Sequence, residues 1–305
     1  MFISVTIQTY NNAEMLSSTL ESLCTLRCPQ GADYEILVVN NSSSDHTQQV
    51  IKTYGELLKP RLRSVFERRQ GLSYARNRAL YEARGEIVCF LDDDVKVENG
   101  WLEAVYTTFK ENPVSVVGGR SYLIFQKPRP RWLSPTAESL LSRLDLGDKL
   151  LVDTEKDLVG LNLSVLRKTA LDIGGFDNRL GRNGNLLISG EEHEFLIRVR
   201  KIGGIIAYEP KAVVGHIVPK ERLTRGWFLK RSYFGGISGI RMKIAQGQKP
   251  KLKQNLSHCL RCFGGFLRTL LFSHTTAADL FERQIWALFS LGALMETVKV
   301  KAARK

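Results

Sequence analysis

The sequence predicts an α/β fold, in which helices flank a mostly parallel mixed sheet and a basic helical extension follows. Short apolar runs alternate with segments whose apolar residues recur at helical spacing, and this strand–helix unit occurs four times before residue 112. Charge marks the extension. The chain of 305 residues has a net charge of +13, but residues 220–305 hold 17 Lys and Arg against 4 Asp and Glu, whereas the preceding part holds 27 of each. A neutral globular part therefore carries a basic segment. Such a segment is typical of proteins that bind an anionic partner.

The elements follow from these patterns in chain order. We expect strands at residues 2–7, 35–39, 62–66, 88–91 and 211–215, where short β-rich runs end at polar residues. We expect helices at residues 15–23, 50–58, 74–83, 101–109 and 191–202, the last stopped by Gly203. Residues 113–162 are less regular and include a proline-rich basic loop at 127–132, while residues 256–272 and 281–298 are further apolar stretches compatible with helices.

Polar residues follow three of the expected strands. They are Thr9-Tyr10-Asn11, Asn40-Asn41 and Asp92-Asp93-Asp94. Open α/β sheets bind ligands at the carboxyl ends of their strands, so we expect these loops to grip one ligand. The three carboxylates are either a solvated acidic turn or a site for Mg²⁺ or Mn²⁺ carrying a phosphate. The glycine-rich signatures of dinucleotide dehydrogenases and of P-loop NTPases are missing after the first strand, which argues against both classes.

Four motifs together resemble family 2 glycosyltransferases. They are Ser4–Asn11 (SVTIQTYN), Val38–Asp45 (VVNNSSSD), Gly71–Asn77 (GLSYARN) and Phe90–Asp94 (FLDDD), and the likeness covers roughly residues 2–216. The resemblance implies the GT-A fold, a Rossmann-like sheet, and transfer of a sugar from a nucleotide-diphosphate sugar to a hydroxyl acceptor with inversion. It implies a domain at residues 1–218, with a nucleotide-sugar-binding half (1–112) and an acceptor half (113–218), followed by a basic amphipathic helical tail (219–305).

The resemblance also implies roles for individual residues. Those that bind the nucleotide-sugar are Thr9, Tyr10, Asn12, Asn41, Arg76, Asp92 and Asp93. Many relatives carry Asp where this chain has Asn41, and an amide donates as well as accepts hydrogen bonds. The last carboxylate of the acidic motif coordinates Mn²⁺ or Mg²⁺ directly, which by position is Asp94, with Asp92 a further candidate ligand.

A cluster of glutamates opens the helix expected at residue 191. Acids in a first turn interact favourably with the helix dipole and need no other role. The cluster is similar, however, to the family's Glu-Asp motif, whose second carboxylate removes the acceptor proton. By position that base is Glu192, and the register between Glu191 and Glu192 stays open. His216 follows the strand at 211–215 and is either a third metal ligand or a structural hydrogen-bonding residue.

The tail mixes bases with Trp, Phe and Leu, a composition typical of helices lying in a membrane interface. We expect contact with an anionic membrane surface, although a helical lid packed on the catalytic domain is the alternative; nucleic acid is not expected. The first residues lack a secretion signal, so the expected location is cytoplasmic and peripheral on the cytoplasmic face of the membrane. The expected acceptor is a glycan or a lipid-linked hydroxyl in polysaccharide or glycolipid synthesis.

Two other functions remain open at this point. A non-catalytic module that only binds a nucleotide-sugar would tolerate Asn41 and Glu192. A sugar nucleotidyltransferase would need a glycine-rich basic loop after the first strand, and residues 9–12 contain neither glycine nor a base.

Overall fold

The computed structural model describes residues 1–184, 186–271 and 276–303. Within these residues, nine strands form one sheet. The strands are β1 (Phe2–Thr9), β2 (Asp33–Asn40), β3 (Leu62–Phe66), β4 (Ile87–Asp92), β5 (Val95–Val97), β6 (Val116–Phe125), β7 (Leu151–Val152), β8 (Asn162–Leu166) and β9 (Ile206–Val218). Their order is β3-β2-β1-β4-β8-β6-β9-β5, and β7 pairs with β9. The first four are parallel to one another, whereas β4–β8 and β6–β8 are antiparallel, so the sheet is mixed as expected.

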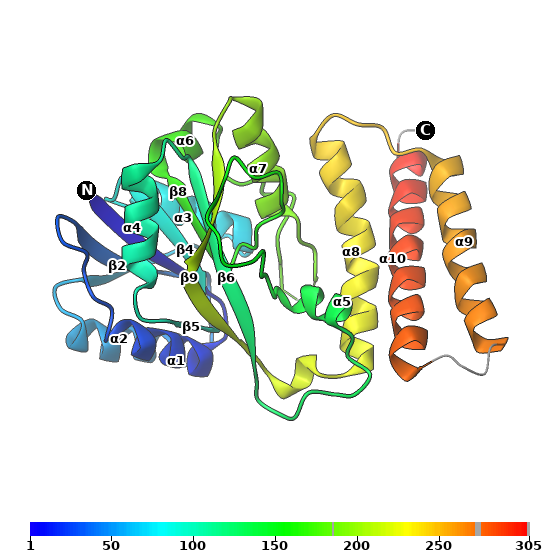
Figure 1. Ribbon diagram of the computed structural model, residues 1–305, viewed down its shortest axis with the longest axis horizontal. Helices are drawn as coiled ribbons and strands as arrows, with labels where there is room; N and C mark the ends of the chain where they lie inside the picture. Colours follow the sequence, from blue (N-terminus) through cyan, green and yellow to red (C-terminus); the bar gives the residue numbers. More distant parts are fainter. Residues whose placement is uncertain (185, 272–275, 304–305) are drawn as a thin grey trace. The chain divides into compact units, whose positions relative to one another are not determined.

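Helices cover the sheet or follow it. They are α1 (Ala13–Leu23), α2 (Thr47–Leu57), α3 (Leu72–Glu82), α4 (Trp101–Glu111), α5 (Pro135–Glu138), α6 (Arg167–Asp172), α7 (Glu191–Lys201), α8 (Arg225–Ala245), α9 (Leu252–Leu271) and α10 (Ala277–Ala302), with 3₁₀ turns η1 (Ser139–Leu141) and η2 (Lys220–Arg222) (Figure 1). In the described part of the chain, no helix combines the length and apolar character needed to cross a bilayer.

The core has two layers because alternate residues of a strand point to opposite faces of the sheet. Ile36 and Val38 of β2 pack on one face with apolar residues of α1, α2 and α4. Leu37 and Val39 pack on the other face with α3, α6 and the residues of α7 from Phe195 onward. These strands are buried on both faces, which explains their continuous apolar sequences.

Strand β6 lies in the stretch that the sequence presented as irregular. Its glycines weaken the strand signal, but the structure requires them. A Cβ on Gly119 would lie 2.0 Å from the Ala212 carbonyl oxygen, and one on Gly118 would lie 2.7 Å from Leu158 Cδ1. The glycines therefore permit the close approach that packs β6 into the sheet.

The chain divides into two compact units. The first comprises residues 1–124, 142–178 and 195–217, and the second comprises residues 125–141, 179–194 and 218–305. The last segment of the second unit starts at Val218, and the unit also takes in two earlier segments, so the predicted division at residues 218 and 219 stays a prediction. The assignment of a nucleotide-sugar half and an acceptor half stays a prediction.

The second unit is built around α10, which packs against both α8 and α9 (Figure 1). Glycines bring α8 and α10 together, since a Cβ on Gly236 would lie 1.9 Å from the Phe289 carbonyl oxygen. The basic loop at 127–132 is anchored here by Trp132, whose ring centroid lies 5.5 Å from that of Phe228 and 4.7 Å from that of Phe281.

Candidate functional site

The polar loops meet at one edge of the sheet because of strand register. Thr9 at the end of β1 pairs with Asn40 at the end of β2, and Gln8 pairs with Asp92 at the end of β4. Thr9 is buried, whereas the Tyr10 side chain is 40% exposed. The carboxyl ends of three adjacent parallel strands therefore bring together Thr9, Asn41 and Asp92, three of the residues predicted to bind the nucleotide-sugar.

Asp93 is held by a neighbouring loop. The Asn12 side-chain amide donates to Asp93 Oδ1 at 2.7 Å. Burial and, next, the neighbouring Asp94 charge raise the pKa of Asp93 to about 7, although hydrogen bonds from Thr9 and Asn12 oppose the rise. Neighbouring carboxylates repel one another when they are charged, and a bound cation would relieve this repulsion. Because burial raises the pKa of Asp93, this part of the acidic motif differs from a solvated turn.

Asp94 faces His216 through strand pairing. Val95 of β5 pairs with His216 of β9, and His216 Nε2 lies 3.3 Å from Asp94 Oδ2. Both residues are buried. A carboxylate oxygen suits Mn²⁺ or Mg²⁺, and an imidazole nitrogen is a common ligand of transition metals. Within the described ranges, no group of three or more His, Cys, Asp or Glu side chains that could hold a metal is found, and Asp94 and His216 offer two ligand atoms side by side.

Asp92 has a different neighbour. Arg76 Nη2 lies 3.4 Å from Asp92 Oδ1, and the Arg76 guanidinium lies 5.4 Å from the ring centroid of Phe176. Arg76 is almost fully buried, and a Cβ on Gly160 would lie 2.5 Å from its Nη2. Arg76 thus contacts Asp92 at the carboxyl end of β4. The role of Asp92 as a further metal ligand stays a prediction.

The Asn41 amide is engaged by the loop after β3. Its nitrogen donates to the carbonyl oxygens of Glu67 (3.2 Å) and Arg69 (2.7 Å), and its oxygen accepts from the Gly71 amide at 2.9 Å. Both amide protons are therefore used within the protein, which leaves one acceptor lone pair for a ligand. Its structural contacts make Asn41 an anchor for the loop that leads into α3.

The glutamates belong to the second unit. Glu191 and Glu192 open α7, as predicted, and the unit boundary falls within this helix after Glu194. The segment before the helix is held to α8, because the Ser189 amide donates to Ser238 Oγ at 3.0 Å and a Cβ on Gly190 would lie 3.8 Å from Met242 Sδ. Glu192 Oε2 is buried and has no hydrogen-bond partner among the described residues.

Arg231 of α8 is a residue of this cluster that the sequence did not single out. Arg231 and Ser238 are seven residues apart in α8 and lie on one face of it. Burial lowers the pKa of Arg231 and the nearby charge of Arg182 lowers it further, whereas Glu192 and Glu191 raise it. The sequence showed only one base among many in the tail, so no signal distinguished Arg231.

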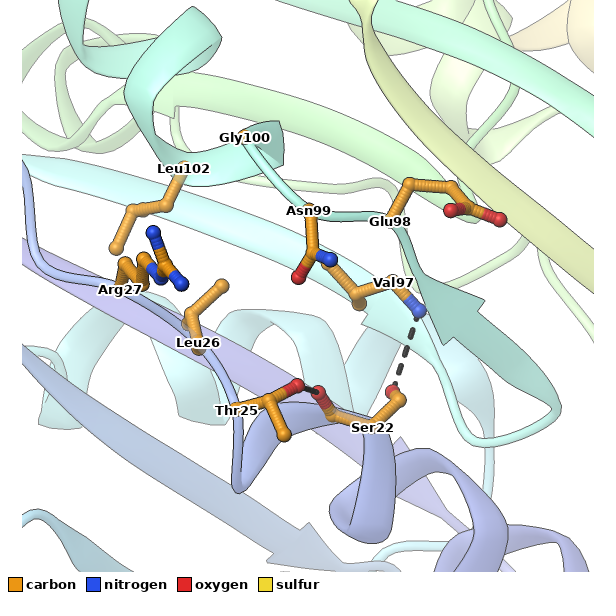
Figure 2. Close-up of a pocket in the computed structure, with 9 residues that line it drawn as sticks. All are labelled: Ser22, Thr25, Leu26, Arg27, Val97, Glu98, Asn99, Gly100 and Leu102. Carbon is orange, nitrogen blue, oxygen red and sulfur yellow. Dashed lines mark hydrogen bonds between the residues drawn. The ribbon is translucent and has the colours of Figure 1, made fainter.

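A small pocket lies elsewhere in the first unit. It is lined by Ser22, Thr25, Leu26, Arg27, Val97, Glu98, Asn99, Gly100 and Leu102 (Figure 2). It sits at the C-terminal end of α1, and the Val97 amide donates to Ser22 Oγ at 3.2 Å beside it. None of the predicted site residues lines it, so we assign it no ligand.

Comparison with known proteins identifies the relatives of this chain. Residues 4–172 match the model of the family described as "Glycosyl transferase family 2". The chain is 26% identical over 242 residues to the glucosyl-dolichyl phosphate glucuronosyltransferase of Haloferax volcanii, covering 78% of this chain and 76% of the relative. It is 27% identical over 238 residues to the succinoglycan biosynthesis protein ExoM of Rhizobium meliloti, covering 77% of this chain and 73% of the relative.

Solved structures share the fold. The mannosyltransferase PcManGT from Pyrobaculum calidifontis, in complex with GDP-Man and Mn²⁺, aligns with a TM-score of 0.59 at 19% identity over 99% of this chain and 74% of that chain. Staphylococcus aureus TarS 1-349, in complex with UDP, aligns with a TM-score of 0.55 at 17% identity over 99% of this chain and 92% of that chain. The predicted GT-A fold with a helical C-terminal region is confirmed.

Proposed function

The chain belongs to glycosyl transferase family 2 and is a glycosyltransferase, and from this premise we propose that it transfers a sugar from a nucleotide-diphosphate sugar to a hydroxyl acceptor with inversion. The observation that carries this proposal is the gathering of Thr9, Asp92 and Asp93 at the carboxyl ends of neighbouring parallel strands. Complexes of solved relatives with GDP-Man and with UDP support a nucleotide-sugar donor.

We propose that Mn²⁺ or Mg²⁺ is held by Asp94 and His216. The 3.3 Å contact between their side chains and the raised pKa of Asp93 support a cation at this point. The Mn²⁺ in the complex of PcManGT agrees with a divalent metal in this fold. When bound, the metal would neutralise charge on the diphosphate leaving group.

The remaining donor residues each have a proposed task. Tyr10, exposed at the end of β1, contacts the base, and Thr9 borders the same pocket. Asn12 holds Asp93 toward the ribose through the 2.7 Å hydrogen bond, and Arg76 holds Asp92. Asn41 supports the pocket through its loop contacts and offers its remaining lone pair to the ligand.

Glu192 is our candidate for the general base. The choice of Glu192 over Glu191 comes from its position in the Glu-Asp motif, and its buried Oε2 atom has no hydrogen-bond partner among the described residues. Glu192 would take the acceptor proton while the hydroxyl oxygen bonds to the anomeric carbon. The bond from that carbon to the diphosphate breaks in the same step, which inverts the configuration.

The acceptor that we propose is a glycan or a lipid-linked saccharide, in polysaccharide or glycolipid synthesis. The names of two relatives, a glucosyl-dolichyl phosphate glucuronosyltransferase and a succinoglycan biosynthesis protein, support this class. We further propose that the enzyme is peripheral on the cytoplasmic face of a membrane and contacts anionic lipid through its tail, which carries 17 bases and 4 acids.

The test is a screen of UDP- and GDP-sugars for slow donor hydrolysis, with Mn²⁺, with Mg²⁺ and with excess chelator. We expect at least one donor to release its nucleotide in a metal-dependent way, and Asp94→Ala to remove that release. Thermal shifts with the same donors report binding separately. Hydrolysis that is unchanged by the chelator and by Asp94→Ala would contradict the metal assignment.

A further inference from the structure

Helix α9 exposes a row of leucines. Leu256, Leu260, Leu267 and Leu270 are 45%, 66%, 57% and 54% exposed. At about 100° per residue these four fall within an arc of about 80°, so they form a continuous stripe along the helix, which we call the leucine face. Single exposed leucines are ordinary on a protein surface, but four in one row mark an interaction surface.

Bases flank the leucine face on one side. The residues of α9 include Lys253, Arg261 and Arg268 but no Asp or Glu. By the same helical geometry, the three bases lie about 60–140° around the helix from Leu256, next to the leucines. Long basic side chains beside an apolar stripe place their stems along apolar surface and their charges at its edge.

The opposite flank of α9 is covered by α10. Asn255 donates to Thr297 Oγ1 at 2.7 Å, and Cys259 is 7% exposed. Asn255 and Cys259 lie about 60–100° from Leu256 in the other direction around the helix. Contact with α10 therefore orients α9 while leaving the leucine face and the adjoining bases on the surface of this unit.

We propose that the leucine face of α9 inserts into the surface of an anionic phospholipid membrane, with Lys253, Arg261 and Arg268 at the lipid headgroups. The inference deepens the membrane contact of the proposed function and rests on that part of it. An apolar stripe bordered by bases, without acids, is complementary to an anionic membrane surface. A second copy of the same helix would bring its own positive charges against these bases, so it is a poorer partner. Helix α10 also exposes Trp286, Met295 and Val298, but it carries three acids, whereas α9 combines exposed leucines with bases and has no acid.

The experiment is flotation of the full chain with vesicles of phosphatidylglycerol and phosphatidylcholine, compared with vesicles of pure phosphatidylcholine. We expect binding to the anionic vesicles that weakens with salt. The double variant Leu260→Glu/Leu267→Glu should lose affinity by at least about tenfold for each leucine. Arg261→Gln/Arg268→Gln keeps the leucines and should bind more weakly with a flatter salt dependence.

The matched control is Met295→Glu/Val298→Glu, which adds the same charges at positions of α10 that are 50% and 45% exposed. This control should bind as the unaltered protein does. Donor hydrolysis measured on every variant reports folding and separates loss of membrane binding from loss of the proposed activity. No binding by the unaltered chain, equal loss in the control, or a concentration-dependent dimer abolished by Leu260→Glu/Leu267→Glu would overturn the proposal.

Discussion

The residues proposed to bind the nucleotide-sugar and the metal are positioned by strands, whereas the candidate base is positioned by a helix. Thr9 and Asp92 are placed by the register of parallel strands, and Asp94 and His216 by an antiparallel pair, all within the first unit. Glu192 instead sits in the first turn of a helix whose preceding segment is tied to α8 in the second unit. Strand register determines the spacing of the first group closely, whereas the orientation of Glu192 depends on the packing of α8. Variants of the two groups should therefore fail in different ways.

The largest expected effect is at Glu192. Glu192→Gln removes the proton acceptor and should lower the rate of transfer roughly 10²–10⁴-fold, the usual contribution of a general base. Donor affinity, measured by thermal shift or calorimetry, should persist because the donor residues belong to the other unit. Glu191→Gln is the matched control and should have a much smaller effect. A larger loss in Glu191→Gln would assign the base to Glu191.

A smaller effect is expected at His216. His216→Ala removes one proposed ligand and leaves Asp94 in place, so metal affinity should fall by at least about 10–100-fold, the loss that removing a residue behind a ligand already causes. The rate measured against Mn²⁺ concentration should therefore recover at high metal, which Glu192→Gln should not do. His46→Ala removes an exposed histidine and serves as the control. An unchanged metal dependence in His216→Ala would make His216 a structural residue.

The smallest effect on catalysis is expected at Glu35, which supports the strands of the first unit. It accepts hydrogen bonds from Ser4 Oγ (2.6 Å), Arg63 Nε (2.7 Å) and the Arg84 amide (2.9 Å). Burial raises the pKa of Glu35, but the hydrogen bonds from Arg63, Ser4 and Arg84 outweigh it and lower the pKa below the ordinary value of 4.5. The stabilisation is therefore fully present above pH 4.5 and is lost as the pH falls through the lowered pKa.

Glu35→Gln should lower the free energy of unfolding by about 1–3 kcal/mol at neutral pH. Thermal denaturation at several pH values should show this difference shrinking below pH 4.5, while the rate of transfer changes little. Glu56→Gln is the control, because Glu56 forms an exposed pair with Lys59 and should affect stability by no more than about 1 kcal/mol. A constant difference between Glu35→Gln and the unaltered protein across the pH range would contradict the lowered pKa.

The early elements could be predicted because local pattern and burial agree there. The strand at 62–66 has the predicted bounds, and β1, β2 and β4 contain the predicted runs with one to three more residues at their ends. Strand β6 was not foreseen, since Gly118 and Gly119 weaken the strand signal and their reason lies in close contacts with distant residues. The loop contacts of Asn41 and the position of Arg231 were not foreseen either, because each depends on partners far along the chain.

The sequence by itself determined the fold class, the family and the order in which polar loops follow the strands, because these depend on the spacing of residues along the chain. Tertiary structure decided the rest. It paired Asp94 with His216 and Asp92 with Arg76, grouped the glutamates with the C-terminal helices, and left the leucine face of α9 exposed. The physical reason is that charge pairing, close packing and exposure depend on distances between residues that are remote in sequence, and no local pattern contains those distances.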